Sequence, residues 1–144
     1  MKKPKNINLL DCFYVLDGQK PRHPVDLEEW ERLFEIQHRR VAETETELYR
    51  VSTVFLGVAH GSHRDGPPDL FETMVFTSPE YAAIVPREES MDHKTIRYVS
   101  WSDAEAGHAT QVRRLERQID LLTKATAKNR EENRKADAEG PQKD

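Results

Sequence analysis

The feature that most constrains this chain is a long stretch near its C-terminal end in which almost nothing opposes a helix. The stretch begins at Ser102-Asp103-Ala104-Glu105, which matches a capping box and places two acidic residues where the helix dipole favours negative charge. Only Gly107 interrupts the run before about residue 127. The sequence therefore predicts a helix over residues 102–127.

Four branched apolar residues of this helix follow one another at spacings of three, four and three, and so lie on one narrow stripe. These residues are Val112, Leu115, Ile119 and Leu122. In a heptad the β-branched pair takes position a and the leucines position d, which favours parallel dimers. The stripe predicts either a coiled coil between copies or packing on the chain's own sheet. It is short for an independent coiled coil, yet the helix outruns the core of so small a chain, which favours self-association.

A second helix is predicted over residues 27–37. Asp26 can cap it, and Glu29 follows three residues later, as in a capping box. Ahead of this helix, Asp17-Gly18 stands between two extended runs and indicates a short hairpin.

The middle of the chain predicts a small sheet. The apolar run 51–58 and the run 70–77 read as two strands that pair antiparallel through a wide loop rich in glycine and proline. Residues 95–99 predict the last strand, and residues 39–47 are a more polar candidate for another. The expected fold class is α+β: a small antiparallel sheet with one N-terminal helix and a long C-terminal helix.

The domain organisation follows from these elements. Residues 1–10 are expected to be a flexible lead, and residues 11–101 an α+β core. Residues 102–127 form the long helix and candidate coiled coil. Residues 128–144 contain no apolar residue larger than alanine, and therefore predict a disordered, charged tail.

Composition narrows the function classes. The net charge is −4 with the two signs interleaved, which disfavours nucleic-acid binding. The candidate cations for such binding would be Arg39, Arg40, Arg113, Arg114 and Arg117. No apolar segment approaches the roughly 20 residues of a membrane span, and Cys12 is the single cysteine. We therefore expect a soluble, cytoplasmic protein without a membrane partner.

The loop between the two best strands carries candidate metal ligands. His60, His63, Asp65 and the following Glu72 supply nitrogen and oxygen donors that suit zinc or another divalent metal. The spacing matches no strong metal-binding motif, and the alternative is a solvated loop whose histidines face water.

Glu72 is a candidate catalytic residue because it alternates with Leu70, Met74 and Phe76 along its strand. If that face were the core, the carboxyl group would need a partner or a raised pKa, as a general acid or base has. The alternative is pairing with an arginine. The candidate partners are Arg50, Arg97 and Arg39.

His108 lies one turn before the apolar stripe. It is either a packing residue or, together with Glu72 and His60, the completion of a pocket that binds a metal or small ligand. No serine or cysteine nucleophile motif and no phosphate-binding loop is present in the sequence.

Four segments carry a resemblance to a known family. They read "VDLEEWERLFE", "VSTVFLGVAHG", "GPPDLFETMVF" and "RYVSWSDAEAGHATQV". Together they resemble a family of small uncharacterised proteins encoded by phages and prophages, chiefly of actinobacteria. The resemblance implies expression in an infected bacterial cell and a place in the virion or against host defence, and it implies no activity.

The sequence therefore favours a non-enzymatic phage accessory protein that binds a phage or host protein and self-associates through its C-terminal helix. The alternative is a protein that binds a metal or small ligand at His60, His63, Glu72 and His108, with hydrolysis as a candidate reaction.

Overall fold

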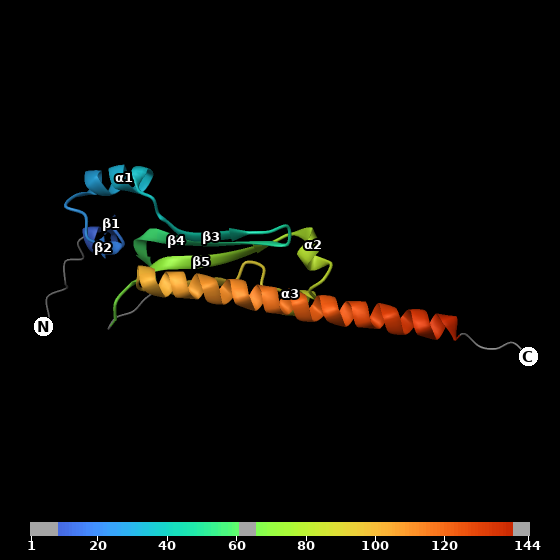
Figure 1. Cartoon of the computed structure of the whole chain (residues 1–144). Helices are drawn as coiled ribbons and strands as arrows, with labels where there is room; N and C mark the ends of the chain where they lie inside the picture. The colour runs from blue at the N-terminus through green and yellow to red at the C-terminus, as the bar shows by residue number, and fades with distance from the viewer. Residues whose placement is uncertain (1–8, 61–65, 140–144) are drawn as a thin grey trace, which may run out of the picture.

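The computed structural model describes residues 9–60 and 66–139 of the 144-residue chain. It confirms the expected α+β class, with two small antiparallel sheets, a short N-terminal helix and a long C-terminal helix (Figure 1). In chain order the elements are a 3-10 turn at Leu9–Cys12, β1 at Val15–Asp17, β2 at Lys20–Arg22, α1 at Leu27–Ile36, β3 at Arg40–Glu45, β4 at Tyr49–His60, β5 at Asp69–Thr77, α2 at Pro79–Ala82, a 3-10 turn at Arg87–Glu89, β6 at Thr95–Tyr98 and α3 at Trp101–Ala138.

The main sheet has the order β3-β4-β5-β6, and every neighbouring pair is antiparallel. β4 and β5 form the expected hairpin, in register from Tyr49↔Thr77 to Phe55↔Phe71. The polar candidate strand at 39–47 corresponds to β3, which pairs with β4 at the edge of the sheet. The order of strands follows the chain, so the whole sheet is a simple meander.

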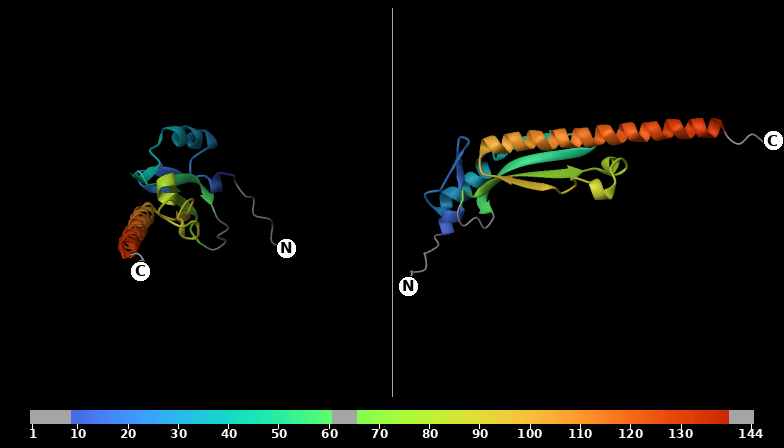
Figure 2. Two further views of the ribbon diagram at one scale, coloured as in Figure 1. Left: turned by 90° about the vertical axis from the view of Figure 1, so that its right-hand side faces the viewer. Right: turned by 90° about the horizontal axis from the view of Figure 1, so that it is seen from below.

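One face of this sheet is covered by α3 (Figure 2). From Phe71 to Val75 every second residue of β5 is buried, with Phe71, Thr73 and Val75 at 0%, 1% and 0% exposure. Val75 packs in one apolar cluster with Leu115 of α3, and Phe71 packs in a second cluster with Ala104. The core of the protein therefore lies between the sheet and the first half of α3.

The opposite face of the sheet is half-exposed and carries ion pairs between strands. Glu72 of β5 accepts from Nε of Arg97 on β6 at 3.1 Å, and Glu43 of β3 accepts from Arg50 of β4 at 3.3 Å. An antiparallel sheet can face water on one side, and here that side mixes charged and apolar residues. β4 is the central strand expected from its apolar content, although only one of its faces is fully buried.

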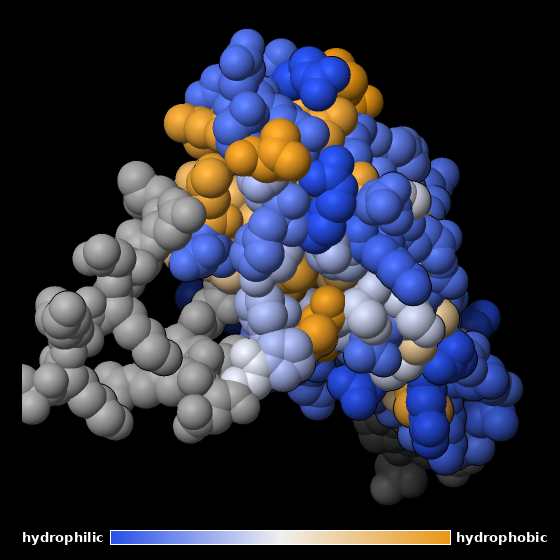
Figure 3. Space-filling model, turned by 90° about the vertical axis from the view of Figure 1, so that its left-hand side faces the viewer, coloured by the Kyte–Doolittle hydropathy of each residue, from blue (hydrophilic) through white to orange (hydrophobic). Residues whose placement is uncertain are grey.

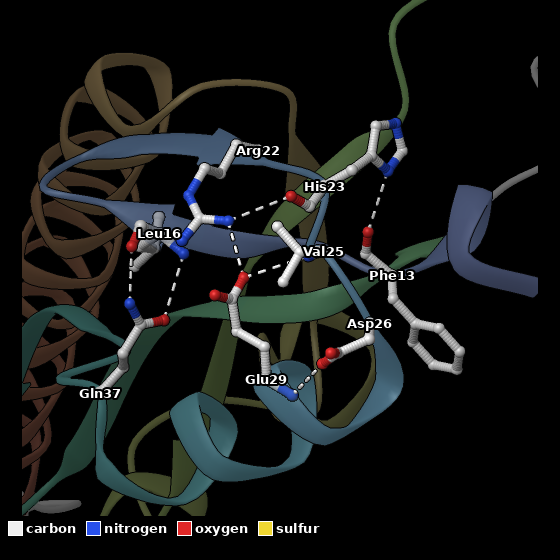
Figure 4. A network of polar contacts seen from close by, with 8 residues as sticks. All are labelled: Phe13, Leu16, Arg22, His23, Val25, Asp26, Glu29 and Gln37. Carbon is white, nitrogen blue, oxygen red and sulfur yellow. Dashed lines mark hydrogen bonds and ion pairs between the residues drawn. The ribbon is translucent and has the colours of Figure 1, made fainter.

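Helix α1 begins where the sequence predicts, because Asp26 caps it by accepting from the backbone N–H of Glu29 at 2.8 Å. The carboxylate of Glu29 turns back and accepts from Arg22 at 2.8 Å and from the backbone N–H of Val25 at 3.2 Å (Figure 4). The bond to Arg22, followed by the backbone bond, holds the pKa of Glu29 below its usual value. These contacts fix the start of α1 to the β1–β2 hairpin.

The other end of α1 is held by Gln37, the residue that follows the helix. Its side chain accepts from the backbone N–H of Leu16 at 3.1 Å and donates to the carbonyl of the same residue at 2.6 Å (Figure 4). Between the two ends, Trp30 donates from Nε1 to the carbonyl of Gly57 at 3.0 Å. Gly57 has a φ of +76°, and a Cβ there would lie 3.1 Å from the ring of Phe34, so glycine allows α1 to approach β4 closely.

The N-cap of helix α3 lies two residues earlier than the capping box at Ser102 predicts. Ser100, and not Ser102, is the N-cap, and its Oγ accepts from the backbone N–H of Asp103 at 3.0 Å. Both serines have an acidic residue three positions later, so the local capping pattern alone favours neither.

The same helix continues to Ala138, so the boundary expected at residue 127 is placed too early, and residues 128–138 are helical where a disordered tail was expected. Good helix formers dominate this part of the chain. Ion pairs one turn apart also support it, between Lys124 and Asp120 at 3.0 Å and between Lys135 and Glu131 at 3.8 Å. A helix of 38 residues is about 57 Å long, and it extends well past the sheet (Figures 1 and 2).

Candidate interaction surface on helix α3

The apolar stripe of α3 packs against the chain's own sheet. Leu115 is fully buried in a cluster with Tyr49, Val51 and Tyr81. The other three stripe residues are partly buried against that same cluster; they are Val112, Ile119 and Leu122. The stripe therefore packs on the chain's own sheet, which is the alternative to a coiled coil. Association between copies would have to use another side of the helix.

Hydrogen bonds at the flanks of the stripe fix the rotation of α3 about its axis. The hydroxyl of Tyr49 donates to the carboxylate of Glu116, and burial together with this bond raises the pKa of Tyr49 above its usual value. Tyr81 donates to Gln118 Oε1 at 2.6 Å, and Gln118 in turn donates to the carbonyl of Glu89 at 2.6 Å. These bonds therefore determine which side of α3 points away from the sheet.

His108 is a buried packing residue held by threonines. Its Nδ1 lies 2.8 Å from Thr53 Oγ1 and its Nε2 lies 2.9 Å from Thr44 Oγ1. Thr53 is also hydrogen-bonded to Thr73 at 2.6 Å, so a single polar network joins α3 to three strands. Burial lowers the pKa of His108, because the charged imidazolium would lose its hydration. Both ring nitrogens of a neutral histidine therefore have a hydrogen-bond partner, and the network fixes the helix to the sheet.

Glu72 lies on the other face of the sheet from His108. Thr73, the next residue along β5, belongs to the His108 network, and successive side chains of a strand point to opposite faces. The carboxylate of Glu72 pairs with Arg97, one of the arginines named as an alternative partner. The structure therefore separates Glu72 from His108, and the pocket that was to contain both is not formed.

The remaining candidate ligands are in the loop. His60 is the last residue of β4, where its backbone pairs with Asp69, while His63 and Asp65 lie outside the described residues. Within residues 9–60 and 66–139, no group of three or more histidine, cysteine, aspartate or glutamate side chains is arranged to hold a metal ion.

From Arg114 onward the outward side of α3 is exposed. Each position two residues after a stripe position is turned about 200° from it, and so points away from the sheet. The outer face consists of the exposed residues at these four positions and of the lysine one turn further along the helix: Arg114, Arg117, Leu121, Lys124 and Lys128. Leu121 is 56% exposed and is one of the few large apolar side chains on the surface of the described chain. The outer face is therefore cationic with an apolar residue at its centre.

The arginines considered for nucleic acid do not form one surface. Arg114 and Arg117 belong to the outer face, on one side of the sheet. Arg39 lies near α1 on the other side, where its guanidinium carbon is 3.8 Å from the ring centre of Phe34. Arg40 pairs with Glu43 at 2.9 Å. These positions do not produce the single basic patch that nucleic-acid binding normally needs.

Sequence reasoning missed most of the outer face, because it singled out only the apolar stripe. Leu121, Lys124 and Lys128 repeat at spacings of three and four, shifted by two residues from that stripe. This shifted repeat is the sequence pattern from which the outer face could be predicted. The threonine partners of His108 had no comparable signal, since Thr44, Thr53 and Thr73 meet only through the pairing of three strands.

Comparison with known proteins adds no family to this description, since no family model, curated protein or solved structure matches the chain. None of the helices in the described part of the chain combines the length and the apolar character that crossing a bilayer requires. The class that fold and site define is an α+β protein with a four-stranded meander, one covered sheet face and a long helix whose outer face is exposed.

Proposed function

We propose that this protein is a non-enzymatic accessory protein that works by binding other proteins, including further copies of itself, through the outer face of α3. The proposal rests on the different environments of the two sides of this helix. Its inner side is used by the chain's own core, while its outer face is exposed and charged and extends beyond the sheet. A helix that projects from a small domain presents a contact surface at little cost to the fold.

The direct test is the mass of the protein in solution. We expect sedimentation equilibrium to give a mass above 16.7 kDa at micromolar concentration, and Arg117→Glu with Lys124→Glu to return it towards the monomer. The matched control is Arg87→Glu with Lys94→Glu, which reverses two exposed cations that belong to neither α1 nor α3 and should leave the mass unchanged. A wild-type protein that stays monomeric at high concentration would contradict self-association.

The biological setting belongs to the same proposal and rests on the resemblance to phage and prophage proteins. It places the protein in the cytoplasm of an infected bacterium or in the virion, with a phage or host protein as partner. Mass spectrometry of purified virions and of infected cells distinguishes the two locations. Absence of the protein from both would contradict the setting, and it would leave the binding surface on α3 to be judged by the mass measurement.

A further inference from the structure

We infer that the outer face of α3 binds the exposed side of α1 in a second copy of the chain. This inference rests on the proposed function, because it names the surface that self-association uses. Helix α1 carries exposed charges that have no partner within the described chain. Glu28, Arg32 and Glu35 are exposed on this helix, and none of them forms an ion pair with another described residue.

The side of α1 that carries these residues is held outward by the rest of the structure. Its apolar side faces β4, where Trp30 bonds to Gly57 and stacks on Phe34 with ring centres 4.9 Å apart. Its two ends are tied by Glu29 and Gln37 to the β1–β2 hairpin (Figure 4). The exposed carboxylates are therefore presented on a helix with a fixed orientation.

The two helices carry matching patterns of opposite charge. On α1 the signs run negative, positive, negative at Glu28, Arg32 and Glu35, with spacings of four and three. On α3, taken in the reverse direction, they run positive, negative, positive at Lys124, Asp120 and Arg117, again with spacings of four and three.

Antiparallel packing of the helices therefore brings each charge opposite one of the other sign. The first and last charges of each pattern are seven positions apart, or about 10.5 Å along the helix axis, so the three pairs can form together. The pairs are Glu28 with Lys124, Arg32 with Asp120, and Glu35 with Arg117.

Both surfaces also expose apolar side chains beside these charges. Leu121 is 56% exposed on the outer face of α3, and Ile36 is 69% exposed at the end of α1. Apolar residues lie among charged ones on the end of the molecule that carries α1 (Figure 3). Exposed charge pairs alone give orientation and specificity more than affinity, so the apolar residues are needed for a stable contact.

The pairing cannot form within one chain, because α1 and α3 lie on opposite sides of the main sheet (Figures 1 and 2). The contact is therefore between copies and joins two different surfaces. Such a head-to-tail contact leaves one surface free at each end, and it continues into a ring or an open chain of subunits.

The alternating signs favour this occupant over a nucleic acid. A phosphate backbone presents negative charge only, and it would gain from a continuous row of cations. Asp120 lies beside the cations of the outer face, between Arg117 and Lys124 along the helix, and already pairs with Lys124 at 3.0 Å. An acidic helix that contains an arginine offers Asp120 a partner of opposite charge. The phosphate backbone of a nucleic acid offers none.

A charge-swap experiment tests the pairing. Sedimentation velocity is run on the full chain at low salt, with circular dichroism confirming that each variant is folded. The first variant is Arg117→Glu with Lys124→Glu, and the second is Glu28→Lys with Glu35→Lys. We expect each to weaken self-association at least about tenfold, or about 1.4 kcal/mol. Mixed in equal amounts they should recover association as assemblies in which the two variants alternate, because the α3 of each then meets an α1 of matching charge in the other. All four changes in one chain should also restore association.

The outcomes separate this inference from the proposed function. Association that is lost in the first variant but kept in the second would overturn α1 as the partner and leave the outer face of α3 in place. Association that survives the first variant, or is absent from the wild type, would overturn both. Fluorescence anisotropy with a duplex DNA probe adds an independent result. Tight binding to DNA that only the first variant abolishes, by a protein that does not self-associate, would overturn the inference in favour of a nucleic-acid partner.

Discussion

The two halves of α3 are one continuous helix in two different environments. In the first half, Ala104, His108, Gln111 and Leu115 are buried against the sheet. From residue 123 onward every described residue of the helix is exposed. The first half is stabilised by packing, and the second by helix propensity and ion pairs along its own surface. The comparison shows how a small core can support a helix that extends well beyond it.

The largest expected difference between the halves is the cost of removing a leucine. Leu115→Ala removes a fully buried side chain and should lower the free energy of unfolding by about 2–5 kcal/mol. Leu121→Ala changes an exposed residue on the same helix, and it should alter stability by no more than about 0.5 kcal/mol. Urea denaturation of both variants measures the two values. Similar losses in the two would mean that α3 does not pack as described.

A smaller effect is expected from alanine at Gly107. A Cβ there would lie 2.2 Å from the ring of Tyr98, so the ring has to move, at a cost of about 1–3 kcal/mol. The higher helix propensity of alanine returns about 1 kcal/mol of this. Ala125→Gly is the counterpart in the exposed half, and it should reduce helix content without shifting the thermal midpoint. Gly107→Ala proteins as stable as the wild type would show that Tyr98 does not approach the helix so closely.

Acid should weaken the first half selectively, through His108. Burial lowers the pKa of this histidine in the folded protein, so the unfolded chain takes up the proton first as the pH falls. Its contribution to stability is complete above an unfolded-state pKa of about 6.5 and is lost as the pH decreases below that value. Unfolding free energies at pH 7.5 and 5.5 measure the loss, which should be smaller in His108→Gln. An equal loss in the variant would assign the pH effect to other groups.

The smallest effect on stability is expected from shortening the exposed half. A chain that ends at residue 127 loses only exposed residues of the helix, so its thermal midpoint should stay within a few degrees of the wild type. Differential scanning calorimetry compares the two proteins. A large decrease in the midpoint would show that residues 128–138 contribute to the core.

The same comparison explains what the sequence could and could not predict. Local signals located α1, where Asp26 is the cap, and the β4–β5 hairpin, where apolar runs flank a turn-rich loop. They placed the end of α3 too early, because a highly charged composition suggested disorder at 128–144. The charges there alternate at helical spacing, as Lys135 and Glu131 do, and such pairs favour the helix.

The candidate site was harder to predict, since its placement depends on which sheet face is buried. Both faces of β5 are apolar in sequence, so alternation could not decide whether Glu72 or Thr73 points to the core. The stripe around Leu115 was equally ambiguous, because packing on a sheet and packing on a partner helix need the same residues. In each case the choice is made by contacts between distant parts of the chain.

The most direct test of the central claim, that the outer face of α3 is a contact surface while its inner side belongs to the core, is amide hydrogen exchange measured by mass spectrometry at two protein concentrations. In dilute solution, peptides from residues 104–115 should exchange slowly and peptides from residues 123–138 quickly. At high concentration, exchange should slow in peptides covering 117–128 and 27–36 and remain unchanged elsewhere. Exchange that does not depend on concentration in either of these segments would contradict the account.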